Sequence, residues 1–150
     1  MKKMLILFLL IFSFASSAQE FNGVLGIPFG SSKIYTQNEM IKKGWTKSSL
    51  VYDKAMLCFK NKKFANKPVT LIVFSFPRNY LSEVNIFFEN TDDANEVLNA
   101  YIKKYNLKKR ENSDYYATQD ANVFFSLEKN QLYISSIKQY DPDILNTDEL

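Results

Sequence analysis

Few residue types in this chain could do chemistry. It has no histidine and a single cysteine, Cys58. Without histidine there is no Ser-His-Asp or Cys-His pair to activate a nucleophile, and the commonest transition-metal ligand is missing. One thiolate and scattered carboxylates do not supply the ligands of a zinc site. We therefore expect Cys58 to be a small buried hydrophobic residue, and we expect no metal ion or other cofactor.

Carboxylates are the remaining candidates, because a pair of them can hydrolyse a glycosidic bond without histidine. Glu83 and Glu89 share a predicted strand but lie about 20 Å apart at the usual strand rise, which is too far for a catalytic pair. Asp92 and Asp93 begin a predicted helix, where negative charge favours the helix dipole. The acidic residues near the C-terminus lack the spacing and the glycine of a calcium loop. Composition and spacing therefore predict that the protein is not an enzyme.

The first 18 residues have the features of a cleaved secretory signal peptide. Lys2 and Lys3 precede an apolar run over residues 4–14, and small residues follow at Ser16 and Ala18. The run is too short for a transmembrane helix, which needs about 20 residues. We predict cleavage after Ala18 and a bacterial periplasmic or secreted location. Because no cysteine follows the cleavage site to carry a lipid, we expect no stable membrane anchor.

Charge and length restrict the class of the exported part. Removal of Lys2 and Lys3 leaves 17 basic against 16 acidic residues, and these are interleaved along the chain. A nucleic-acid binder usually has a concentrated basic excess, so we expect no nucleic-acid partner. The length suits one domain, which we place over residues 19–140, followed by a flexible acidic tail over residues 141–150.

Helix signals occur at two places. Ser31 and Ser32 offer caps to a helix that ends at Gly44, and Thr91 offers a cap to a second helix that starts with acidic and ends with basic residues. The first helix is expected to bury its apolar side chains Ile34, Met40 and Ile41.

Strand signals surround the second helix. Alternating apolar residues and turn residues predict strands over residues 50–59, 69–76, 81–89, 107–112, 115–118, 122–128 and 131–139. The short connections favour antiparallel pairing, with a tight hairpin turn at Lys129 and Asn130. The expected fold is α+β, with two units of one helix and three antiparallel strands, and with the helices packed on one face of the sheet.

A weak internal similarity agrees with two such units. Residues 40–47 align with residues 101–108 at an offset of 61, and each segment lies at the end of a predicted helix. Ile-Lys-Lys is a common amphipathic string, so coincidence is the alternative explanation.

The order of elements behind a signal peptide, together with Gly26, Pro28 and Gly30 and the Gly44-Trp45 helix end, resembles a known group of exported proteins. These share the fold of the β-lactamase inhibitory protein and of the small lipoprotein of the outer-membrane assembly machinery, and the chain is also similar to exported proteins of the Bacteroidetes. The resemblance implies an α+β sheet that binds other proteins and catalyses nothing. The chain lacks both the lipidation cysteine of the lipoproteins and the disulfide cysteines of the inhibitors, so neither specific role carries over.

Strand parity places an unusual set of side chains on the face away from the helices. If Val84, Ile86 and Phe88 point inward, then Glu83, Asn85 and Phe87 point outward. Aromatic side chains among short polar ones are typical of protein-recognition surfaces. The alternative is that the sheet closes over these side chains to form a second core. The residues predicted to bind a partner are Tyr52, Met56, Asn85, Phe87, Phe124, Ser126, Tyr133 and Ser135.

The sequence thus predicts an exported, non-catalytic domain, inhibitor-like or acting in envelope interactions, that binds an unknown protein or peptide. The alternative functions are carbohydrate binding, glycoside hydrolysis by carboxylates, and self-association as a structural protein. The sequence does not predict the oligomeric state.

Overall fold

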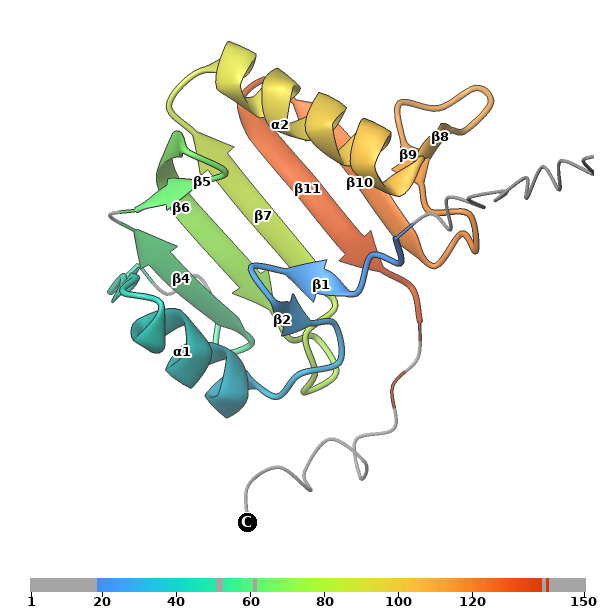
Figure 1. Ribbon diagram of the computed structural model, residues 1–150. Coiled ribbons are helices and arrows are strands. Elements are labelled where there is room, and N and C mark those ends of the chain that lie inside the picture. Colours follow the sequence, from blue (N-terminus) through green and yellow to red (C-terminus); the bar gives the residue numbers. More distant parts are fainter. Residues whose placement is uncertain (1–18, 51–52, 61, 139, 141–150) are drawn as a thin grey trace, which may run out of the picture.

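The computed structural model describes residues 19–50, 53–60, 62–138 and 140 (Figure 1). The predicted signal peptide and acidic tail lie outside the described residues. Thirteen elements occur in this part of the chain: β1 (Gly23–Val24), β2 (Ile27–Pro28), α1 (Lys33–Lys42), β3 (Thr46–Lys47), β4 (Met56–Lys60), β5 (Lys63–Phe64), β6 (Lys67–Ser75), β7 (Glu83–Phe88), α2 (Thr91–Tyr105), β8 (Lys108–Lys109), β9 (Tyr116–Ala117), β10 (Val123–Glu128) and β11 (Gln131–Ser136).

A large antiparallel sheet organises the fold. Its strands follow the order β3-β4-β6-β7-β11-β10-β9-β8, and β5 pairs with β6 outside this path. Strands β1 and β2 form a separate hairpin. Figure 1 shows α2 and this hairpin in front of the sheet, with α1 beside β4. The predicted α+β fold with antiparallel strands is confirmed.

The core lies between the sheet and the elements in front of it. The alternation in β7 buries Val84, Ile86 and Phe88 completely, as the sequence predicts. Phe21 packs its ring edge-on against Phe125 of β10 and Tyr105 of α2, each at a centroid distance of 4.9 Å. Burial of these aromatic side chains, together with that of Val97 and Leu98, holds α2 against the sheet.

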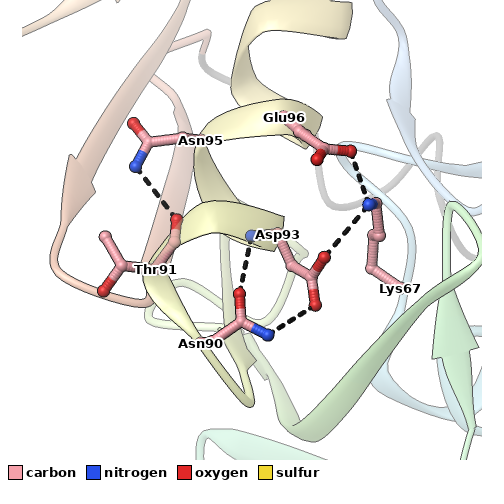
Figure 2. A network of polar contacts seen from close by, with 6 residues as sticks. All are labelled: Lys67, Asn90, Thr91, Asp93, Asn95 and Glu96. Atoms are coloured by element: carbon pink, nitrogen blue, oxygen red, sulfur yellow. Dashed lines mark hydrogen bonds and ion pairs between the residues drawn. The ribbon is translucent and has the colours of Figure 1, made fainter.

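The N-cap of helix α2 lies one residue earlier than predicted. Asn90, not Thr91, is the N-cap, and its side-chain oxygen accepts a hydrogen bond from the backbone N–H of Asp93. Figure 2 shows that Asp93 also contacts the ammonium group of Lys67, which pairs with Glu96 as well. These contacts tie the first turn of α2 to strand β6. Asparagine and threonine are both good caps, so the sequence alone does not distinguish them.

Helix α1 has the predicted ends but a different buried side. Ser32 caps it, and Gly44 follows it with φ +81°. Thr36 and Met40 are buried, whereas Ile34 and Ile41 are 60% and 51% exposed, so their predicted burial is wrong. The physical reason is that α1 packs at the β3–β4 edge and buries only the narrow side that carries residues 36 and 40.

Several strands are shorter than the sequence predicts. The strand expected over residues 50–59 starts at Met56, because Asp53 accepts a hydrogen bond from the backbone N–H of Ala55 and forms a turn. The strands expected over residues 107–112 and 115–118 contract to the two-residue strands β8 and β9. The last strand ends at Ser136. The hairpin turn at Lys129 and Asn130 is confirmed, with Lys129 at φ +54°.

The sheet consists of two related halves that meet between β7 and β11. Residues 83–87 pair with residues 135–131, so Asn85 and Tyr133 form the central pair. Strands β6, β4 and β3 follow β7 outward, and β10, β9 and β8 follow β11 in the same way. Each half has one helix and four strands of the main sheet, and β3 of the first half is not among the predicted strands.

The two helices end with equivalent hydrogen bonds, at an offset that differs from the one seen in the sequence. The backbone N–H of Trp45 donates to Met40 O at 3.0 Å, and that of Leu107 donates to Ile102 O at 3.1 Å. Positions 40 and 102 are 62 residues apart, so the similarity seen in the sequence at an offset of 61 is displaced by one residue. The two Ile-Lys-Lys strings therefore do not occupy equivalent positions at the two helix ends.

The last described residue packs against the N-terminal segment. The ring of Tyr140 lies against Tyr80 at a centroid distance of 5.3 Å, and its hydroxyl group is 3.3 Å from Ser136 Oγ. Gly30 has φ +93°, and a Cβ atom there would lie 2.5 Å from the Tyr140 ring. Only glycine fits this position without strain.

Candidate binding face

One face of the sheet points away from both helices. Val97 and Leu98 of α2 and Met40 of α1 all belong to the core on the inner face. We call the opposite side, formed by β4, β6, β7, β11 and β10, the outer face. The pairing registers place its side chains in cross-strand rows, and these rows contain seven of the eight residues predicted to bind a partner. The eighth, Tyr52, lies outside the described residues.

The central row of the outer face crosses all five strands. It runs in the order Cys58, Val73, Asn85, Tyr133, Ser126. Asn85 Oδ1 accepts a hydrogen bond from Gln131 Nε2 at 2.6 Å, which fixes the orientation of its amide group. Three predicted residues, Asn85, Tyr133 and Ser126, are therefore neighbours in one row.

The two flanking rows contain the remaining predicted residues. One runs Met56, Ser75, Glu83, Ser135, Phe124, and the other runs Leu71, Phe87, Gln131, Glu128. Phe124 and Phe87 thus lie on opposite sides of Tyr133, in different rows. Met56 is separated from Phe87 by β6, and from Phe124 by β6, β7 and β11. The guanidinium group of Arg110 lies 6.0 Å from the centre of the Phe124 ring, a cation–π contact.

Burial divides the outer face into two parts. Cys58, Val73 and Ser75, on β4 and β6, are buried, although they lie on the side away from the helices. The Ser75 hydroxyl group has no hydrogen-bond partner within the described part of the chain. On β4 and β6 the outer side chains are therefore buried, as the alternative of a second core predicts. The predicted burial of Cys58 is confirmed. The predicted residues of β7, β11 and β10 are half-buried, which leaves their side chains partly accessible: Asn85, Phe87, Phe124, Ser126, Tyr133 and Ser135.

The electrostatics centre on Tyr133. Burial raises the pKa of its hydroxyl group, and the negative charge of Glu83 raises it further. Tyr133 therefore remains protonated at neutral pH and is available as a hydrogen-bond donor. Tyr115, which is 48% exposed, lies close enough to contribute to the same shift.

This surface includes three further residues, which the sequence does not single out as binding residues: Glu83, Tyr115 and Gln131. Glu83 shares strand parity with Asn85 and Phe87, so its side of the sheet is predictable. Its position diagonal to Tyr133 depends on the register between β7 and β11, which a single sequence does not specify.

The outer face offers little for covalent or metal chemistry. Burial raises the pKa of the Cys58 thiol, which disfavours the reactive thiolate. Among the described residues, no group of three histidine, cysteine, aspartate or glutamate side chains is arranged to hold a metal ion. Neither α1 nor α2, the two helices of the described ranges, is long and apolar enough to cross a membrane. The arrangement suits non-covalent contact through aromatic rings, amides and hydroxyl groups.

Comparisons with known proteins do not assign this surface. The chain matches no protein-family model, no curated protein and no solved structure.

Proposed function

We propose that this is an exported, non-catalytic domain that binds a protein or peptide through the β7–β11–β10 part of its outer face. The observation that carries the proposal is the central row, in which Asn85, Tyr133 and Ser126 lie side by side between the rings of Phe87 and Phe124. Aromatic side chains held by their neighbours bury a large area at low entropic cost when a partner covers them. The adjacent amide and hydroxyl groups give such a partner directional hydrogen bonds.

The edges of the sheet are less suited to this role. The terminal strands of the main sheet, β3 and β8, are each two residues long, and both carry lysine. Short, lysine-bearing edges oppose the addition of a further strand. Binding through the face therefore fits the architecture better than binding by strand addition.

The carboxylates do not favour the hydrolase alternative. Glu83 begins β7 and Glu89 follows its last residue, so the two lie at opposite ends of the strand. Inverting and retaining glycosidases both need two carboxyl groups within about 10 Å of each other.

The proposal is tested by crosslinking from the two sides of the sheet. A photoreactive residue is placed at Ser126 on the outer face, and in a matched variant at Asn95, an exposed position on α2. We expect a discrete protein adduct in intact cells from position 126, and not from position 95. Adding Tyr133→Ala should reduce that adduct at least tenfold while the midpoint of thermal unfolding changes little.

Two results would contradict the proposal. One is the same set of adducts from positions 126 and 95, which would indicate random collision. The other is full adduct formation in the Tyr133→Ala variant with the probe at position 126, because the central row would then contribute nothing.

A further inference from the structure

Charge is unevenly divided between two parts of the chain. Residues 33–63 contain eight lysines and only two acidic residues, Glu39 and Asp53. The rest of residues 19–150 contains nine basic and fourteen acidic residues. The prediction that basic and acidic residues are interleaved along the chain is therefore wrong for residues 33–63. The net charge of residues 19–150 is close to zero because a basic segment is offset by an acidic remainder.

The fold gathers several of these lysines around α1. Lys47 Nζ donates a hydrogen bond to Gln37 Oε1 at 2.6 Å. Lys33 donates to the backbone carbonyl of Lys54, and Lys62 donates to that of Lys43. Glu39, which contacts Lys42 at 2.8 Å and Lys43 at 4.0 Å, offsets part of this charge. The surface around α1 therefore carries a large positive excess.

The solvent side of α1 carries two exposed isoleucines. Ile34 and Ile41, 60% and 51% exposed, are seven residues apart, so they project from the same side of the helix two turns apart. The side chain of Lys42, 72% exposed, lies next to Ile41 in the sequence. This side is opposite the one that buries Thr36 and Met40. We call this surface, formed by Ile34 and Ile41 and the lysines around them, the α1 surface; the lysines are Lys33, Lys42, Lys43, Lys47 and Lys62.

We propose that the α1 surface makes reversible contact with a membrane rich in anionic phospholipid. Isoleucine side chains that project from a helix can enter the fluid headgroup layer of a bilayer, which needs no preformed pocket to receive them. The lysines around them are attracted to phosphate groups, each with a modest contribution that salt screens. An acidic protein or a nucleic acid would engage the lysines and gain little from the isoleucines. The inference does not depend on the proposed function, since it concerns a different surface.

Vesicle co-sedimentation of the exported protein tests the proposal. The vesicles contain phosphatidylcholine with about 30 mol% phosphatidylglycerol, and matched vesicles contain phosphatidylcholine alone. We expect binding to the anionic vesicles only, with a steep loss as salt is raised. Ile34→Ser with Ile41→Ser should weaken binding about tenfold, and Lys42→Glu with Lys47→Glu by more than that.

Matched controls come from elsewhere on the molecule. Ile137 is 63% exposed outside α1, so Ile137→Ser removes a similar apolar side chain and should leave binding unchanged. Lys103→Glu with Lys104→Glu reverses the same charge at the end of α2 and should weaken binding far less than the lysine pair near α1.

Three outcomes would overturn the inference, and the first needs no variant. Equal binding of the unaltered protein to both kinds of vesicle, or to neither, would remove the role of anionic lipid. Unchanged binding of the double isoleucine variant, with soluble polyglutamate displacing the protein from vesicles, would indicate a general polyanion site. An equal effect of the control lysine pair would show that net charge, not the α1 surface, governs binding.

Discussion

Asn85 of β7 and Tyr133 of β11 are direct cross-strand partners at the centre of the sheet, where its two halves meet. Both side chains point to the outer face and both are half-buried. In their row, Cys58 and Val73 on one side are buried, and Ser126 on the other side is half-buried. The role of this face can therefore be tested by measuring the stability of variants as well as the binding of a partner.

Phe124 and Phe125 are adjacent residues of β10 that point to opposite faces. Phe125 is completely buried in the core, whereas Phe124 is half-buried on the outer face. Phe125→Ala should therefore lower the free energy of unfolding by about 3–5 kcal/mol, and Phe124→Ala by about 1 kcal/mol. Chemical denaturation measures both. Equal losses would mean that the outer face is a second core at β10 too.

The N-cap of α2 gives a second matched pair. Asn90→Ala removes the acceptor for the backbone N–H of Asp93 and should cost about 1 kcal/mol of stability. Thr91→Ala, one residue later, alters a side chain that does not cap the helix and should cost much less. Thermal unfolding of the two variants distinguishes them, and a larger loss for Thr91→Ala would place the cap at the residue predicted from sequence.

The ion pair of Asp93 with Lys67 predicts a pH dependence. The hydrogen bond from Lys67 lowers the pKa of Asp93, so the stabilisation is present above the ordinary aspartate pKa and is lost as pH falls through the lowered value. Lys67→Ala should be less stable than the unaltered protein at about pH 7, and this difference should shrink toward about pH 2. Unfolding midpoints across this range measure it.

Lys109→Ala is the control for this titration, because Lys109 is an exposed lysine on the edge strand β8. Its difference from the unaltered protein should not follow the titration of Asp93. A constant difference for Lys67→Ala over the whole range would contradict the assignment.

Glu83 and Tyr133 offer a spectroscopic test of the outer face. Glu83→Gln should lower the pKa of Tyr133, because it removes a nearby negative charge, but the pKa should stay above the ordinary tyrosine value since burial is the larger cause. NMR titration of ring-labelled tyrosine, assigned with Tyr133→Phe, measures the shift. Glu89→Gln, just past the opposite end of β7 from Glu83, should leave the value unchanged, and an equal shift would refute the proximity of Glu83.

Gly30 tests the packing of Tyr140. Gly30→Ala combines a positive φ with a clash against the Tyr140 ring and should cost more than Gly26→Ala, where φ is +74° but the space is open. The φ contribution alone is about 1–2 kcal/mol. In a Tyr140→Ala background the additional cost of Gly30→Ala should fall to that contribution. A cost that persists in full would show that the ring is not the obstacle.

How far the sequence predicts this fold depends on the kind of signal. Buried alternation in β7, β10 and β11 is a local pattern, and Val84, Ile86, Leu132 and Ile134 are correctly predicted to face the core. The exposure of Ile34 and Ile41 is not local, since it depends on α1 packing at an edge of the sheet. The lengths of β8 and β9 depend likewise on pairing partners distant in sequence.

The candidate site shows the same division. Parity correctly groups Asn85 with Phe87 and Phe124 with Ser126, because neighbours on one strand alternate. The burial of Cys58 follows from its residue type, but the division of the outer face into a buried part with Val73 and a half-buried part with Asn85 and Tyr133 needed the order of strands across the sheet, which no single strand contains.

The meeting of the two halves has a consequence for their independence. Each half ends in a strand, β7 or β11, whose pairing edge is covered only by the other half. Neither half alone would therefore satisfy the backbone groups along that edge, and each would present an open strand edge that favours pairing with another chain. The halves nevertheless differ in their surfaces: the first contains the lysine-rich residues 33–63, while the second supplies Phe124, Ser126 and Tyr133.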